Sequence, residues 1–283
     1  MSDIAFFLHI PRTAGTTLNT ILLNNFKADE IISVYEKDDY DLHAFHSAEE
    51  LKSIRLIQGH LLLQRYAPPM MYGQPVRVFT FLREPVERLV SEYAFLRSWP
   101  ANHLYRHLNG NAVSFREYIE SREKQLVYRG KNFMTRCISG MDDSRNYPVR
   151  AIARAKMHLE KSFGCVGIQE RFMESIVMLA EFLGLENLLH EKRNALNKSA
   201  FPEISSEERA VAEEYNRGDI ELYRFASELF DDRVKALGTE FSEKVRKLEF
   251  LNTKFQKISN LLMKQSETKE EGAILMPKDG LWK

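Results

Sequence analysis

The sequence predicts an α/β fold in which helices flank a central parallel sheet, followed by a mostly helical C-terminal part. The first observation is a pair of continuous apolar runs, residues 4–10 and 76–82, with the length and character of strands buried on both faces. The second is that each run leads directly into a turn and an amphipathic helix, which is the order of a βα unit. Residues 163–168 and 170–185 repeat that order later in the chain.

Shorter strands are predicted beside these units. Residues 31–34 and 54–58 have strand character, and the second run ends in Gly59 and His60. Because open α/β sheets bind ligands at the carboxyl ends of their strands, we expect His60 at the ligand-binding edge. Residues 68–75 contain three prolines and a glycine, so this segment is predicted to form a loop.

The C-terminal third is predicted to be helical. Ser205 and Glu208 give the pattern of a capping box at the start of one helix. Residues 239–264 form a charged helix whose apolar residues recur every three or four positions. We therefore expect an α/β domain over residues 1–238, an amphipathic helix over 239–265 and a mobile tail over 266–283. The apolar stripe at 241–262 could pack on its own domain or join two copies of the chain.

Composition limits the classes of function. The 283 residues are 44% hydrophobic and 28% charged, which is typical of a globular protein, and the formal net charge is zero. A neutral chain has no overall attraction to nucleic acid, so we expect no nucleic-acid partner. The two cysteines, Cys137 and Cys165, give no metal-ligand spacing, and His43 with His46 lacks a third ligand. We therefore predict no metal site.

The turn after the first strand has the composition of a phosphate-binding loop. Its sequence is PRTAGTT, in which Pro11 and Gly15 interrupt the regular backbone and a helix follows. Such a turn directs backbone N–H groups, the positive end of the helix and the cation of Arg12 to one place. The sheet is therefore predicted to be P-loop-like, although Thr16 occupies the position of the Walker A lysine.

A second strand–turn–helix unit carries another candidate anion site. The strand at 76–82 continues into REPVERLVSEY, which places Arg83 at the end of the strand and Ser91 on the following helix. Pro85 suits the first turn of that helix, and Glu84 suits its positive end. Arginine and serine can together supply a charge-assisted contact and a hydroxyl donor to a phosphate.

The two loops together resemble the sulfotransferases that use 3′-phosphoadenosine 5′-phosphosulfate (PAPS). PRTAGTT is similar to their PKTAGT or PKTGST loop, with arginine in place of lysine, and REPVERLVSEY is similar to their RDPxxRxxSxY motif. IQGHLLLQRY, between them, resembles a Gly-His segment of bacterial sulfotransferases and heparan sulfate 2-O-sulfotransferases. The likeness extends over residues 4–237.

The resemblance implies transfer of a sulfuryl group from PAPS to an acceptor hydroxyl by in-line displacement, leaving adenosine 3′,5′-bisphosphate (PAP). The 5′-phosphosulfate would lie in the loop formed by Arg12, Thr13, Ala14, Gly15, Thr16 and Thr17. In the same comparison Arg83 and Ser91 would hold the 3′-phosphate, and Lys198 could assist them. His60, at the Gly-His position, is the predicted base. Arg12 would stabilise charge on the leaving phosphate rather than donate a proton, because arginine is a poor acid.

The acceptor is expected to bear a hydroxyl, on a glycan or on a small molecule. Two other functions stay open from the sequence: a P-loop nucleotide kinase or NTPase, and a non-catalytic nucleotide-binding scaffold that assembles through residues 241–262. A kinase or NTPase should have the Walker lysine, which is absent here. A non-catalytic scaffold would not need Arg12, His60, Arg83 and Ser91, which are all present.

The sequence also leads to an expected location. No segment approaches the roughly 20 apolar residues of a membrane span, and the N-terminus lacks the basic region and cleavage site of a signal peptide. Golgi sulfotransferases carry an N-terminal anchor, which this sequence does not show. We therefore predict a cytoplasmic protein without a membrane span.

Overall fold

The computed structural model describes residues 3–35, 52–60, 70–71, 74–141, 149–191 and 202–274. Its centre is a parallel sheet with the strand order β2-β3-β1-β5-β6. The strands are β1 (Ile4–Leu8), β2 (Ile31–Val34), β3 (Leu56–Gly59), β5 (Gln74–Leu82) and β6 (Phe163–Ile168). A two-residue strand, β4 (Met70–Met71), pairs antiparallel with the start of β5 inside the predicted loop. The α/β class with a central parallel sheet is therefore confirmed.

Strand β1 lies at the middle of the sheet because its side chains suit burial on both faces. All five of its residues are buried, and it pairs with β3 on one side and β5 on the other. The registers align Leu8 with Gly59 and with Thr80, and the Thr80 hydroxyl donates to the Leu8 carbonyl at 2.8 Å. The carboxyl ends of β1, β3 and β5 therefore meet at one edge of the sheet.

Helices cover this sheet and share its apolar core. They are α1 (Gly15–Leu23), α9 (Phe133–Ser139), α10 (Val149–Lys161) and α11 (Phe172–Leu183), with short 3₁₀ turns η1 (Ala28–Glu30) and η3 (Gln169–Arg171). Leu18, Ile21 and Leu22 of α1 are buried against the sheet. Both Cys137 and Cys165 are buried thiols within the same core.

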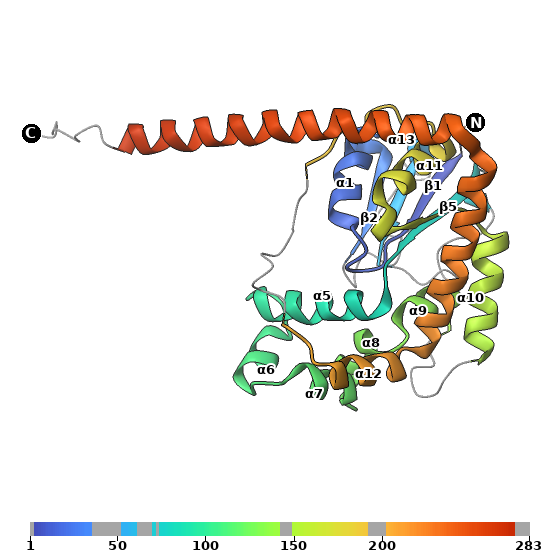
Figure 1. Ribbon diagram of the computed structural model, residues 1–283, viewed down its shortest axis with the longest axis vertical. Coiled ribbons are helices and arrows are strands. Elements are labelled where there is room, and N and C mark those ends of the chain that lie inside the picture. The colour runs from blue at the N-terminus through green and yellow to red at the C-terminus, as the bar shows by residue number, and fades with distance from the viewer. Residues whose placement is uncertain are drawn as a thin grey trace, which may run out of the picture.

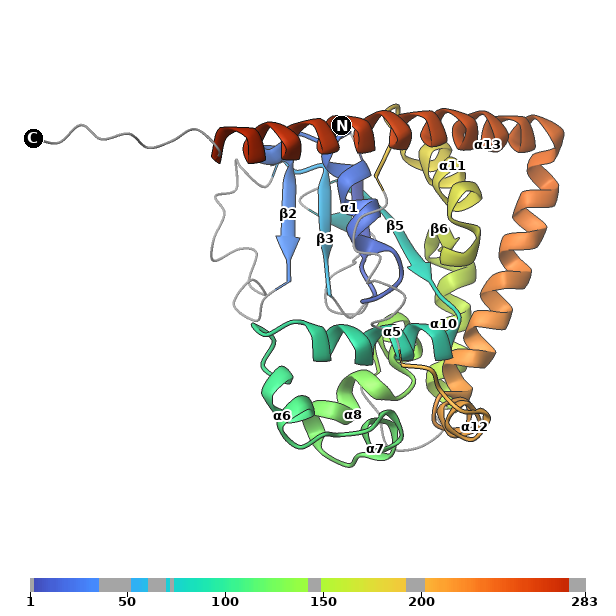
Figure 2. The same ribbon diagram turned by 60° about the vertical axis from the view of Figure 1, so that its left-hand side comes forward.

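A second apolar cluster lies beyond the carboxyl ends of the strands. It is formed by α5 (Pro85–Ser98), α6 (Tyr105–Gly110), α7 (Phe115–Glu120), α8 (Lys124–Gly130) and α12 (Ser206–Tyr215), which gather below the sheet in Figure 2. Its centre includes Leu89, Tyr93, Leu96 and Tyr118, so the apolar stripe predicted on α5 faces these helices. The cluster fixes the position of α5 across the end of the sheet.

The last helix, α13 (Arg217–Ile274), turns sharply at Gly238, where φ is 70° and ψ is −158°. Its two parts point in different directions, as Figure 1 shows. Phe241, Val245 and Leu248 in the second part are buried in the main core, so this part of the predicted stripe packs on its own domain. Farther along, Ile258 is 59% exposed, and self-association through 241–262 stays a prediction.

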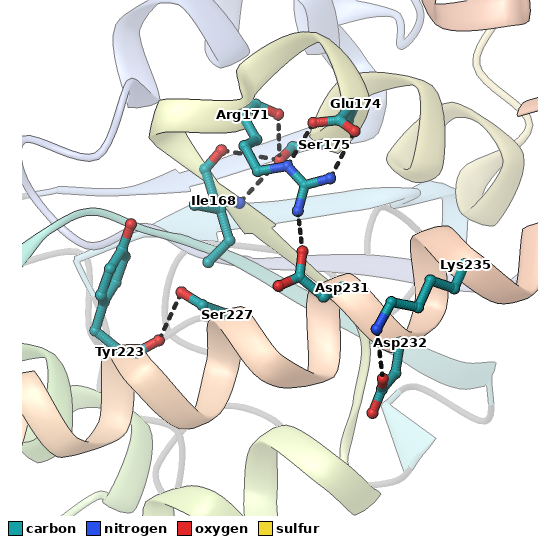
Figure 3. A network of polar contacts seen from close by, with 9 residues as sticks. All are labelled: Ile168, Arg171, Glu174, Ser175, Tyr223, Ser227, Asp231, Asp232 and Lys235. Atoms are coloured by element: carbon teal, nitrogen blue, oxygen red, sulfur yellow. Dashed lines mark hydrogen bonds and ion pairs between the residues drawn. The ribbon is translucent and has the colours of Figure 1, made fainter. Parts of the chain in front are cut away.

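A network of polar contacts joins α13 to the end of β6 (Figure 3). The Arg171 guanidinium pairs with Glu174 at 2.6 Å and also pairs with Asp231 of α13. The Ser175 hydroxyl accepts from the Ile168 N–H at 2.8 Å and donates to the Ile168 carbonyl at 2.9 Å. These contacts hold the start of α11 and the first part of α13 in a fixed relation beside the sheet.

Candidate active site

A cavity of about 1130 Å³ adjoins the loop that follows β1. Its walls come from the ends of β3 and β5, from α5, from the start of α11 and from the second part of α13. The predicted site residues that line it are Arg12, Ala14, Gly15, Thr16, Thr17, His60, Arg83 and Ser91. The structure therefore brings the two predicted anion-binding units and the predicted base to one cavity.

The phosphate-loop prediction corresponds to an unusual backbone. Arg12 and Ala14 adopt positive φ angles of 69° and 67°, which turn the chain sharply between β1 and α1. Ala14 occupies the N-cap of α1, and no side chain caps that helix. Because the first N–H groups of a helix have no partner within the helix, this end can receive an anion.

Thr13 differs from the rest of the loop. Its side chain is fully buried and does not line the cavity, and its hydroxyl donates to the Ile10 carbonyl at 2.7 Å. Any contact of Thr13 with a ligand would therefore be made by its backbone. Its side chain instead fixes the shape of the turn.

The glycine of the loop is required by the packing of His9. A Cβ atom at position 15 would lie 1.7 Å from Nε2 of His9. That ring is held in place, because Nδ1 is 3.1 Å from the Tyr35 hydroxyl and the ring stacks on Phe7 at 5.1 Å. His9 therefore supports the loop from just beyond the end of β1.

Replacing Gly15 with alanine is expected to lower the unfolding temperature by several degrees, because overpacking typically costs about 1–3 kcal/mol. The matched control is Gly110→Ala, since a Cβ atom at that helical position would meet nothing within 4 Å. Thermal unfolding of both variants tests the contact. Equal unfolding temperatures for the two would contradict the close approach of His9 to the loop.

Arg12 and Arg83 lie next to each other. The Arg83 Nη1 donates to the Arg12 carbonyl at 3.4 Å, while Nε of Arg12 donates to the Ser91 hydroxyl at 3.1 Å. The Arg12 guanidinium also lies 4.6 Å from the centre of the Phe95 ring. Burial lowers the pKa of both arginines below the ordinary value, yet arginine stays charged at neutral pH. Two cations are therefore concentrated at the junction of the two loops.

The N-terminus of α5 is capped by an acidic side chain. Glu84 is the N-cap, and its carboxylate accepts from the N–H groups of Val86 at 3.2 Å and Glu87 at 2.7 Å. An anion at this second unit would therefore meet the side chains of Arg83 and Ser91 rather than the helix N-terminus. The two units thus offer different chemistry: backbone N–H groups at α1 and side chains at α5.

His60 follows β3 and joins a group of aromatic rings. Its ring centre lies 4.8 Å from that of His9 and 4.9 Å from that of Tyr35. Burial, with a smaller contribution from the positive charge of Arg129, lowers the pKa of His60 to about 4. The imidazole is therefore neutral at physiological pH and able to accept a proton.

The sequence prediction missed Glu92, a buried acidic residue of this cavity, and its partner Arg129. Glu92 of α5 is 1% exposed, and its Oε1 accepts from Nη1 of Arg129 at 2.8 Å. Glu92 lies between Ser91 and Tyr93 of the second motif. Its spacing of four residues from Arg88 would have placed the two side chains next to each other on one face of the helix. Arg129 comes from α8, in a part of the sequence without a decipherable pattern, so no sequence signal joined the two.

Two earlier predictions fall on residues that the structure does not describe. Lys198, the proposed further phosphate contact, lies outside the described residues, and so do His43 and His46. Among the described residues there is no group of three or more His, Cys, Asp or Glu side chains arranged to hold a metal ion.

Comparison with known proteins gives one family. A family model described as galactose-3-O-sulfotransferase matches residues 2–278. Galactosylceramide sulfotransferase of Homo sapiens is 32% identical over 269 residues, and that of Bos taurus is 24% identical over 273 residues. Each alignment covers 89% of this chain and 63% of the relative, so the chain spans less than two thirds of their length.

The solved structures that match include the crystal structure of mouse sulfotransferase SULT7A1 complexed with PAP. The TM-score is 0.38 at 15% sequence identity, and the match covers 76% of this chain and 63% of the mouse chain. A likeness of this size supports no inference about the fold or the ligand of the present protein.

The comparisons correct the predicted location. Galactosylceramide sulfotransferases are Golgi membrane enzymes, so the prediction of a cytoplasmic protein is wrong. That prediction relied on the lack of an anchor in this sequence, which carries no weight for a chain shorter than its relatives. Within the described part of the chain, no helix combines the length and the apolar character needed to cross a membrane.

Proposed function

Since the chain belongs to the galactose-3-O-sulfotransferase family, we propose that it transfers a sulfuryl group from PAPS to a hydroxyl of a galactose-containing glycan or glycolipid. The observation that carries the proposal is the meeting of Arg12, Arg83, Ser91 and His60 at one cavity. These residues supply what the reaction needs: cations for two phosphate groups and a neutral base.

The donor fits the loop and the start of α5. The N–H groups at the uncapped start of α1 would bind the 5′-phosphosulfate, and Arg83 with Ser91 would bind the 3′-phosphate. In the structure Arg12 donates to Ser91, so binding of the nucleotide would exchange this hydrogen bond for contacts with phosphate. Arg12 would then face the bridging oxygen, on which negative charge grows as the sulfur–oxygen bond breaks.

The chemical step moves one sulfuryl group and one proton. The acceptor oxygen forms a bond to sulfur while the bond from sulfur to the bridging phosphate oxygen breaks, which releases PAP. The proton of the acceptor hydroxyl passes to the neutral imidazole of His60. A base of this kind typically contributes about 10²–10⁴-fold to the rate. The leaving phosphate needs no proton, which makes arginine at position 12 acceptable.

The acceptor class rests on the relatives. The description of the matched family names galactose and its oxygen 3. The curated relatives are named for galactosylceramide. These names support a galactoside carried by a lipid or by a glycan. A kinase or NTPase is the weaker proposal, because Thr16 replaces the Walker lysine and the residue directly after β5 is Arg83 rather than an acid.

The full chain should transfer label from PAPS carrying radioactive sulfur to a β-galactoside, and it should bind PAP more tightly than ATP. Calorimetric titration with both nucleotides tests the donor, and a panel of galactosides, other sugars and galactosylceramide vesicles tests the acceptor. ATP binding as tight as PAP binding would contradict the donor assignment. Transfer to other sugars but not to galactosides would contradict the acceptor class alone.

A further inference from the structure

We propose that Glu92 forms a subsite for a second hydroxyl of the acceptor, next to the hydroxyl that is sulfated. The inference rests on the proposed function and extends it to recognition of the acceptor. It assigns a ligand to a buried carboxylate that the transfer reaction described above does not use.

The first observation is that half of this carboxylate is unused. Glu92 is 1% exposed, and only its Oε1 is engaged, by Arg129. Its Oε2 has no hydrogen-bond partner within the described part of the chain. A buried charged oxygen without a partner is costly, so native proteins seldom leave one without a ligand or a water molecule.

The second observation is the position of the carboxylate. Glu92 lines the cavity, and it directly follows Ser91, the partner of Arg12. Its negative charge is close enough to His60 and to Arg12 to raise the pKa of both, against the larger lowering effect of burial. Glu92 therefore lies among the residues that carry the proposed chemistry.

Arg88 is the other buried charged residue in this part of α5. Arg88, one turn earlier on α5, also has two buried nitrogen atoms, Nε and Nη1, without a partner among the described residues. Arg88 does not line the cavity, however, and its Nη2 donates to the Arg129 carbonyl at 3.1 Å. Its guanidinium lies 5.4 Å from the centre of the Phe133 ring. Of these two buried residues, Glu92 is the one that lines the cavity.

The chemistry of the free oxygen selects its ligand. An ionised carboxylate only accepts hydrogen bonds, so it requires an O–H or N–H donor and repels the phosphate groups of the nucleotide. A sugar supplies a second hydroxyl beside the one that faces the base. In a galactoside sulfated at O3, the neighbouring hydroxyls are those at C2 and C4. Glu92 would bind one of them and hold the reacting oxygen near His60.

The test is a comparison of methyl β-galactoside with its 2-deoxy, 4-deoxy and 6-deoxy analogues on wild type and Glu92→Gln. In the wild-type protein, loss of one neighbouring hydroxyl should lower kcat/KM by about 10- to 100-fold, the usual range for a hydrogen bond to a charged group. In Glu92→Gln the parent sugar should lose a similar factor, chiefly through KM. In this variant, the difference in kcat/KM between the parent sugar and that deoxy analogue should nearly vanish.

The matched control is Glu87→Gln. Glu87 is also on α5 and paired with an arginine, Arg209, at 2.7 Å, but it is exposed and does not line the cavity. This variant should discriminate among the sugars as wild type does. Calorimetry with PAP checks the nucleotide site of each protein, and NMR saturation transfer measures sugar binding to the PAP complex without turnover.

Unchanged discrimination in Glu92→Gln would overturn the subsite, and so would a variant that loses PAP binding together with sugar binding. Failure of the wild-type protein to bind any of these sugars while it binds PAP would also overturn it. That last result leaves the donor half of the proposed function intact, whereas failure to bind PAP would remove the proposed function itself.

Discussion

Replacing His60 with alanine is expected to lower kcat for sulfuryl transfer by about 10²–10⁴-fold while PAP binding changes little. The loss follows from removal of the proton acceptor, since the imidazole is the neutral base at the end of β3. Single-turnover kinetics with radiolabelled PAPS measure the chemical step, and calorimetry measures the affinity for PAP.

His103→Ala is the control for this substitution, because His103 is an exposed histidine that does not line the cavity. Since the pKa of His60 is lowered to about 4, its base form persists as the pH falls from 7.5 to 6. Activity that depends on this group should therefore decline only as the pH approaches 4. Survival of more than about a third of kcat in His60→Ala would mean that another group removes the proton.

Arg83→Ala is expected to weaken PAP binding by about 100-fold, which corresponds to the loss of charge-assisted hydrogen bonds to one phosphate. Adenosine 5′-phosphate lacks the 3′-phosphate, so its affinity should change by less than about threefold. Calorimetric titration of both nucleotides against wild type and variant therefore separates the two phosphate sites.

Arg77→Ala, on β5 before Arg83 and outside the cavity lining, is the control for loss of a positive charge. It should bind both nucleotides as the wild-type protein does. An equal loss of affinity for PAP and adenosine 5′-phosphate in Arg83→Ala would contradict the 3′-phosphate assignment. The contact of Arg83 with the Arg12 carbonyl would then be the better account of the residue, as a support of the loop.

Most of the sheet was predictable because its strands are continuous apolar runs. The predicted strands at 31–34 and 163–168 have the bounds of β2 and β6, and those at 4–10 and 76–82 differ from β1 and β5 by two residues at one end. β1 is shorter than predicted because the chain leaves the sheet before Pro11. β5 begins earlier than predicted because its first residues pair with β4. Hydrophobic periodicity contains no information about either event.

The two loops of the site could be predicted because each lies within one short segment. Adjacent residues in PRTAGTT and REPVERLVSEY create their own turns, so local sequence was sufficient. The pairing of Glu92 with Arg129 joins α5 to α8 across 37 positions, and His9 reaches Tyr35 across 26. Contacts of this kind depend on how helices pack, and a single sequence does not encode them in a readable pattern.

The kink at Gly238 divides the residues that line the cavity into those synthesised before it and those synthesised after it. The cavity takes walls from residues near the beginning of the chain, such as Arg12, and from Phe241 and Val245 after the kink. A ribosome that has translated only the first 238 codons has already produced every described strand of the sheet. The nascent chain can therefore begin to fold its sheet before the last wall of its pocket exists.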